Sequence, residues 1–303
     1  MSTLGTLTRM RMQLAIRNKM FFFFSVVMPL GFFFLYSGVF AKSEPHAVTY
    51  LLGEVLALNV MGSFWGLSAA LVSFREQGIL RRFHVTPVTA SDMLASSVLA
   101  SFVLTLPTVV LELLLTRYLY HVPSLGNVFV LFVLVGIGTI SFGSMGLVVA
   151  SVTNTMQETQ VINQLIWLPL IFLSGATVPL LYLPKMVQRI GLFLPATYLV
   201  SGLTDAIFRS ASLWSVRIAL TSLIIWAVLT FFVSAQLFRW EPEAKIPRNA
   251  KLFALATVLP FILLGIWELS NGDLILKAQS NSHFLDQLQQ MEKAAQKATQ
   301  PDQ

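Results

Sequence analysis

The sequence predicts an all-α polytopic membrane protein, and three observations carry this prediction. Of its 303 residues, 55% are hydrophobic and only 11% are charged, and the mean hydropathy is +0.73. A soluble domain with so few charges lacks the polar residues that cover a surface in water. Apolar runs long enough to cross about 30 Å of hydrocarbon recur along almost the whole chain. These runs are continuous rather than alternating, which favours helices over the strands of a β-barrel.

Residues 1–20 are basic and are expected to form an amphipathic helix along the cytoplasmic interface. The segment holds four Lys and Arg residues and no acid, and Leu4, Leu7, Met10 and Leu14 recur at helical spacing. We expect its basic residues to lie among anionic headgroups. A cleavable signal peptide is excluded, because the following apolar run is long and no small-residue cleavage site ends it.

Residues 21–239 are predicted to form a six-helix membrane domain. Pro29 is expected to kink the first helix, and the fourth contains GIGTISFGSMG, whose small residues let a neighbouring helix approach closely. The predicted membrane helices are 21–41, 50–73, 94–116, 125–152, 160–178 and 213–238.

Residues 179–208 are apolar but contain three prolines that divide them into pieces too short to span a bilayer. This pattern is typical of two re-entrant or interfacial half-helices, with the backbone breaks buried in protein. Residues 240–269 follow as a charged linker and a further predicted span at 252–269. Residues 270–303 form a polar, Gln-rich tail.

The dense clusters of basic residues set the expected orientation. They lie at the N-terminus, in 74–93 and in 239–251, and such clusters favour the cytoplasmic side. We therefore expect a multi-pass protein of the plasma (inner) membrane with a cytoplasmic N-terminus. The same rule explains the net charge of +6, so no nucleic acid partner is expected.

The polar island Phe74–Met93 lies between two apolar segments. Glu76–Val85 is long enough for about two and a half helical turns, which should end before Pro87. Thr89 or Ser91 can then cap the next helix, with Asp92 in its first turn. The result is a rigid polar elbow, whose plainest alternative is a basic turn that only fixes topology.

Two stretches resemble the membrane subunits, or permeases, of the type 2 ABC exporter family. FREQGILRRFHVTPV, from Phe74, resembles that family's loop between the second and third membrane helices. SGATVPLLYLPKMVQRIGLFLPATYLVSGL, from Ser174, resembles its segment before the last conserved helix. The two lie in the right order and two spans apart, and the resemblance covers roughly residues 1–239. Both motifs are more specific for the family than for a substrate.

The resemblance implies a six-helix permease core with an amphipathic N-terminal helix, a coupling helix and outer re-entrant helices. The chain would form the pathway of an ATP-driven exporter for a lipophilic or amphipathic substrate, such as a drug, a lipid or a lipid-linked glycan. The sequence has no G-x-x-x-x-G-K-[ST] phosphate loop, the motif that binds the phosphates of a nucleotide. We therefore expect that this chain is not an enzyme and that ATP is hydrolysed on a separate chain. ATP and magnesium would bind two copies of a separate ABC ATPase, and a second permease would complete a homodimer or heterodimer. The alternative is a non-transporting membrane scaffold or a membrane-embedded enzyme subunit.

The resemblance also assigns two sets of site residues. The coupling contacts to the ATPase would come from Arg75, Glu76, Gly78, Leu80, Arg81, Arg82, Phe83, Thr86 and Pro87. The outer re-entrant gate would comprise Pro179, Leu183, Pro184, Pro195, Thr197 and Tyr198.

Glu54 and Glu112 are ionisable residues within predicted membrane helices, where such residues are candidates for a transport pathway. With the orientation above, both are expected within about two turns of the outer surface, where a carboxylate reaches water. An interfacial or ion-paired role is therefore the alternative. The chain has no cysteine and no clustered histidine ligands, so neither a metal site nor a catalytic site is predicted.

Overall fold

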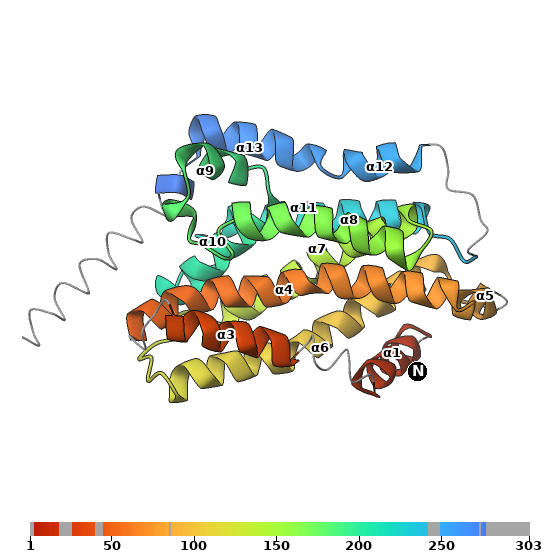
Figure 1. Cartoon of the computed structure of the whole chain (residues 1–303), viewed down its shortest axis with the longest axis horizontal. Coiled ribbons are helices and arrows are strands. Elements are labelled where there is room, and N and C mark those ends of the chain that lie inside the picture. The colour runs from red at the N-terminus through yellow and green to blue at the C-terminus, as the bar shows by residue number, and fades with distance from the viewer. Residues whose placement is uncertain are drawn as a thin grey trace, which may run out of the picture.

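A computed structural model describes residues 3–17, 26–39, 45–84, 86–241, 249–272 and 274–276. Within these residues every regular element is a helix, and most helices run along the longest axis of the molecule (Figure 1). The predicted all-α membrane architecture is therefore confirmed. In chain order the elements are α1 (Thr3–Arg17), α3 (Met28–Val39), α4 (Pro45–Glu76), α5 (Ile79–His84), α6 (Ala90–Tyr118), α7 (Val128–Val152), α8 (Met156–Leu173), η2 (Leu180–Tyr182), α9 (Lys185–Gly191), α10 (Pro195–Phe208), α11 (Arg217–Gln236), α12 (Ala250–Ala256) and α13 (Leu259–Asn271).

Five helical segments are long and apolar enough to cross a membrane, or six if the bent pair α9 and α10 counts as one span. Four of them match predicted spans of the six-helix domain, and the fifth matches the span predicted at 252–269. Of the predicted first helix, the structure describes α3 and the two residues before it; the rest lies outside the described residues. The five segments are Leu51–Glu76, Ala90–Tyr118, Val128–Val152, Arg217–Gln236 and Leu252–Asn271.

The helix predicted at 160–178 has different bounds. α8 begins at Met156 and ends at Leu173, and it is not among the five segments. Gly175 has a φ of +89°, a left-handed conformation that only glycine adopts at little cost, so the chain turns there. The polar first turn of α8 also lowers its hydropathy.

The centre of the bundle is the contact between α4 and α7, which pack along much of their length. A Cβ atom on Gly146 would overlap the carbonyl oxygen of Phe64, and one on Gly143 would lie 2.8 Å from Leu67 Cδ1. The glycines of α7 thus permit an approach that a larger residue would prevent. The close packing predicted from GIGTISFGSMG is confirmed.

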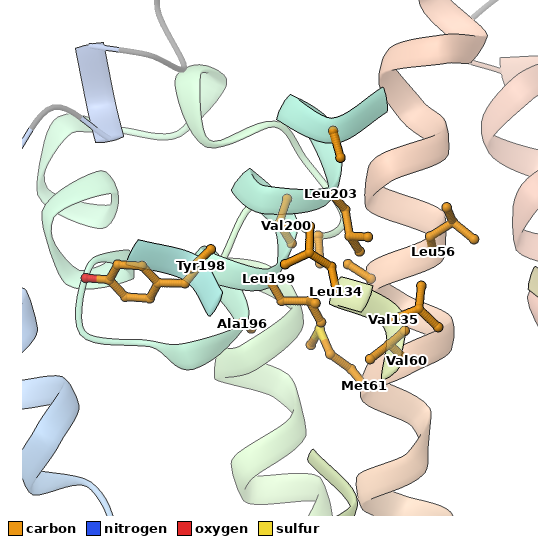
Figure 2. Close-up of a cluster of buried hydrophobic side chains, with 14 of the residues drawn as sticks. Leu56, Val60, Met61, Leu134, Val135, Ala196, Tyr198, Leu199, Val200 and Leu203 are labelled. Atoms are coloured by element: carbon orange, nitrogen blue, oxygen red, sulfur yellow. The ribbon is translucent and has the colours of Figure 1, made fainter. Parts of the chain in front are cut away.

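The helix α10 is anchored in this centre by its apolar face. Figure 2 shows Leu199 and Leu203 of α10 beside Val60 of α4 and Leu134 of α7, whereas Tyr198 points away from this cluster. All four aliphatic side chains are completely buried. Movement of α10 therefore requires repacking of the bundle core.

Candidate functional site

The elbow begins where α4 ends. Gly78 has a φ of +67°, and its N–H donates to the carbonyl of Arg75 at 3.0 Å while the N–H of Gln77 donates to that of Ser73. This is a glycine-based helix stop, so α4 continues to Glu76 and α5 begins only at Ile79. The expected continuous helix from Glu76 is therefore wrong at its start.

The exit from the elbow follows the predicted signals. Thr86 Oγ1 donates to the carbonyl of Phe83 at 2.6 Å, which closes the turn before Pro87. Thr89 is the N-cap of α6, its Oγ1 accepting from the Asp92 N–H while the Asp92 carboxylate accepts from the Thr89 N–H, each at 3.1 Å. This reciprocal pair is a capping box, and it confirms the predicted helix start.

The inner face of the elbow is apolar. Leu80 is fully buried and packs in a cluster with Val72, Leu94, Leu147 and Ala150, which come from α4, α6 and α7. Removing this side chain from water favours one orientation of α5. The short helix is therefore fixed to the bundle by burial as well as by its two turns.

Arg75 lies inside the protein, with 1% of its surface exposed. Its Nη1 donates to the carbonyl of Ala150 at 2.9 Å and its Nη2 to that of Thr153 at 2.6 Å. Arg239 approaches the same place, with Nη2 donating to the Thr153 carbonyl at 2.5 Å and Nη1 to Asn154 Oδ1 at 3.0 Å. We call Arg75 and Arg239, converging on the carbonyl of Thr153, the arginine clasp.

The arginine clasp satisfies the C-terminal end of α7, where helix carbonyls lack partners and the helix dipole is negative. Burial lowers the pKa of Arg239, while the nearby Glu158 carboxylate opposes that shift. A guanidinium stays protonated at neutral pH because its ordinary pKa is so high. Arg239 was absent from the predicted site, since nothing in the local sequence links it to Thr153.

Glu76 joins the elbow to the start of α8. Its Oε1 accepts from the N–H of Met156 at 2.7 Å, and Glu158 Oε2 accepts from the N–H of Asn154 at 2.7 Å. Carboxylates at a helix N-terminus satisfy free N–H groups and complement the dipole. The elbow and the α7–α8 loop therefore form one connected unit.

The outer face of the elbow is exposed and basic. Arg81 lies 3.7 Å from Glu241, measured from Nε to Oε1, but both side chains are well exposed, so the ion pair is weak. The structure thus divides the predicted coupling residues. Arg75 and Leu80 are buried, Gly78 and Phe83 are half-buried, and Glu76, Arg81, Arg82, Thr86 and Pro87 are exposed.

The N-terminal helix α1 packs against α6 near the elbow (Figure 1). Arg11 is buried, its guanidinium lies 5.3 Å from the centre of the Phe74 ring, and its Nη2 lies 2.7 Å from Met93 Sδ. Burial lowers the pKa of Arg11 to about 10. The expectation of headgroup contacts is therefore wrong for Arg11, whereas Arg9 and Arg17 are exposed.

The predicted half-helices are present as α9 and α10, with a bend of 96° between them. Thr197 Oγ1 donates to the carbonyl of Gly191 at 2.6 Å, and Tyr198 Oη donates to that of Leu192 at 2.8 Å. Both side chains thus satisfy the carbonyl end of α9. Pro195 starts α10, where a missing N–H costs nothing.

The remaining gate candidates precede short helical elements. Pro179 comes directly before η2 and Pro184 directly before α9, while Leu183 is half-buried between them. The pair α9 and α10 lies at the opposite end of the molecule from α5 (Figure 1). The gate role of these six residues stays a prediction.

Glu54 and Glu112 lie in the interior rather than near water. Glu54 is 1% exposed and Glu112 is fully buried, and Asn59 Nδ2 donates to Glu112 Oε2 at 3.4 Å. Neither carboxylate has an ion pair within the described residues, and each keeps one unpartnered oxygen there. The expectation that these two carboxylates reach water is therefore wrong. A role of Glu54 and Glu112 in the transport pathway stays a prediction.

Comparison with known proteins places these features in a family. The model of the ABC-2 type transporter family matches residues 3–208. The linearmycin resistance permease protein LnrN of Bacillus subtilis is 26% identical over 182 residues, which is 60% of this chain and 47% of that protein. The inner membrane transport permease YhhJ of Escherichia coli is 27% identical over 158 residues, or 52% of this chain and 41% of that protein.

The putative transport permease YvfS of Bacillus subtilis is 20% identical over 233 residues, covering 73% of this chain and 93% of that protein. The chain spans about half the length of the first two relatives. The family match includes both the elbow and the re-entrant pair and covers more than half of the chain. The chain therefore belongs to the ABC-2 type transporter family as a membrane-spanning permease.

Proposed function

We propose that this permease forms the translocation pathway of an ATP-driven exporter and is coupled to a separate ATPase through the exposed face of the elbow. The observation that carries the proposal is the contrast between the exposed and the buried residues of the elbow. Arg81 and Arg82 are exposed, whereas the neighbouring Leu80 is buried and Arg75 is bonded to the end of α7. A partner that contacts this basic pair would move a unit firmly joined to the bundle.

In this mechanism two copies of the ATPase bind ATP and magnesium beneath two permeases, which form a homodimer or a heterodimer. Closure of the ATPase subunits displaces the elbow as a rigid body. The arginine clasp and Glu76 transmit this displacement to α7 and α8, and the helices shift between inward and outward access. The N-terminus lies in the cytoplasm, and the protein resides in the plasma (inner) membrane.

The proposed substrate is a lipophilic or amphipathic molecule such as a drug, a lipid or a lipid-linked glycan. Support comes from the names of relatives, one a linearmycin resistance permease protein and another a probable multidrug ABC transporter permease. The buried carboxylates of Glu54 and Glu112 are the proposed polar groups of the pathway, since buried acids within spans commonly serve transport.

The experiment uses the permease co-expressed, purified and reconstituted with a candidate ABC ATPase subunit. We expect the double variant Arg81→Glu and Arg82→Glu to lose ATPase co-purification and ATP-dependent uptake of the dye Hoechst 33342 into inverted vesicles. A partner surface that complements the basic pair would be repelled by the reversed charge. Lys185→Glu, an exposed charge reversal at the opposite end, is the matched control. Normal co-purification and dye uptake by the double variant would refute the coupling assignment.

A further inference from the structure

Glu268 is a buried acid that the proposed transport cycle does not use. It lies in the last turn of α13, outside the residues matched by the family model, and is 5% exposed. Its Oε1 accepts from the N–H of Leu274 at 2.8 Å, while Oε2 has no partner among the residues described. Such an oxygen is costly to bury unless a cation or a donor completes it.

Two cavities meet at this side chain. The smaller, of about 30 Å³, is lined by apolar and polar residues, and the polar ones include Asp205, Ser201 and Ser215. The larger, of about 150 Å³, is lined by Arg189 and by aliphatic side chains that include Leu269 and Leu276. Since a water-sized group needs roughly 10–15 Å³, the smaller cavity holds one small polar group and the larger holds a group of several atoms.

The two cavities share Glu268 but differ in their other charged residue. Glu268 and Asp205 border the smaller cavity, and no basic residue lines it among the described residues. Arg189 lines only the larger cavity, where its charge is opposite to that of the shared Glu268. A matching ligand has a small cationic end with several N–H donors and, a few bonds away, an anion suited to the planar fork of an arginine.

The position of the site favours a lipid as the source of this ligand. Glu268 is near the end of the segment Leu252–Asn271, which is long and apolar enough to span a membrane. Headgroups lie at that depth. The aliphatic side chains of Leu269, Ile275 and Leu276 line the same cavity as Arg189 and suit acyl chains.

We propose that this site binds the phosphoethanolamine headgroup of a membrane lipid. The primary ammonium binds Glu268, the phosphate binds Arg189, and the acyl chains lie along Leu269 and Leu276. The bound lipid connects α13, which carries Glu268 and Leu269, to α9, which carries Arg189. It adds to the direct contact of Phe261 of α13 with Tyr198 of α10, whose ring centres are 6.1 Å apart. This lipid site goes beyond the transport function and requires no ATPase.

The test measures thermal unfolding of the delipidated full chain in detergent with added short-chain lipids. We expect dihexanoyl-phosphatidylethanolamine to raise the unfolding midpoint by about 4 °C at saturation. Dihexanoyl-phosphatidylcholine has no N–H donor and dihexanoyl-phosphatidylglycerol has no amine, so each should shift it by less than about 1 °C. Equal shifts for all three lipids would overturn the proposal, and so would an equal shift from free phosphoethanolamine, which would point to a soluble ligand.

Variants then locate the binding. Glu268→Gln keeps an acceptor for the Leu274 N–H but removes the charge, so the phosphatidylethanolamine shift should disappear. Arg189→Gln replaces an exposed side chain and should weaken phosphatidylethanolamine binding about tenfold. Lys185→Gln, on the same helix but outside both cavities, is the control and should bind normally. An unchanged shift in Arg189→Gln refutes the site even if Glu268→Gln fails to fold.

Discussion

The two ends of the molecule stabilise the same kind of group, the last carbonyls of a helix, with different donors. At the elbow, the guanidinium groups of Arg75 and Arg239 donate to the end of α7. At the re-entrant pair, the hydroxyl groups of Thr197 and Tyr198 donate to the end of α9. Hydrogen bonds with a charged donor are roughly twice as strong as neutral ones. The helix end at the elbow therefore has the stronger hydrogen bonds.

This difference agrees with the proposed function. An end that receives force from a motor transmits it only if the angle between its helices is maintained, and charged donors on fixed carbonyls maintain it. An end that opens and closes benefits from weaker bonds and from apolar contacts, such as that of Tyr198 with Phe261. Four variants test the comparison.

The largest effect is expected for Arg75→Ala. Loss of two charge-assisted bonds leaves the carbonyls of Ala150 and Thr153 with fewer donors, which should lower the free energy of unfolding by about 3 kcal/mol. Thermal unfolding in detergent measures this change. Arg81→Ala is the matched control, because its side chain is exposed, and it should change the value by less than about 0.5 kcal/mol. Equal losses in both variants would contradict the arginine clasp.

The next effect concerns the packing between the two ends. Gly146→Ala places a methyl group against the carbonyl of Phe64, and a backbone atom cannot rotate away. We expect a loss of about 2 kcal/mol from overpacking, measured by the same unfolding assay. Gly62→Ala on α4 is the control, since nothing lies within 4 Å of its added methyl group. If Gly146→Ala unfolds like the wild type, the close α4–α7 contact is disproved.

A smaller loss is expected at the re-entrant end. Tyr198→Phe removes one neutral hydrogen bond to the carbonyl of Leu192, so the free energy of unfolding should fall by about 1 kcal/mol. The ring and its contact with Phe261 are kept. A loss as large as that of Arg75→Ala would erase the difference between the two ends.

The smallest effect is expected for Glu241→Gln. This variant removes the ion pair with Arg81, whose two side chains are 71% and 42% exposed. Surface pairs contribute little because water and salt screen them, so the change should stay below about 0.5 kcal/mol in a urea titration. A larger change in the free energy of unfolding would mean that the surface ion pair, and not the arginine clasp alone, stabilises the elbow.

The sequence predicted those features that depend on neighbouring residues. Apolar runs located the spans, and Pro87, Thr89 and Asp92 located the turn and the start of α6, because a proline break and a capping box act within a few positions. The helix break at Gly78 was also readable, since glycine commonly ends a helix. The prediction instead treated it as a helix interior.

Features that depend on distant residues were not predictable from the sequence. Arg75 bonds to carbonyls 75 and 78 positions away, and a backbone carbonyl carries no residue-specific signal. Nothing local therefore separates buried Arg75 from exposed Arg81 and Arg82. The burial of Glu112 next to Asn59, 53 positions away, has the same cause.

The shared carbonyl of Thr153 has a consequence for sequence variation. Arg75 and Arg239 both donate to this one oxygen. If either arginine is replaced, the other still donates to the carbonyl. Only replacement of both arginines leaves the carbonyl without a guanidinium donor. The two substitutions should therefore be non-additive, with the double variant losing more than the sum of the single ones. Homologues that lack one arginine are expected to retain the other, which makes the two positions a pair that evolves together.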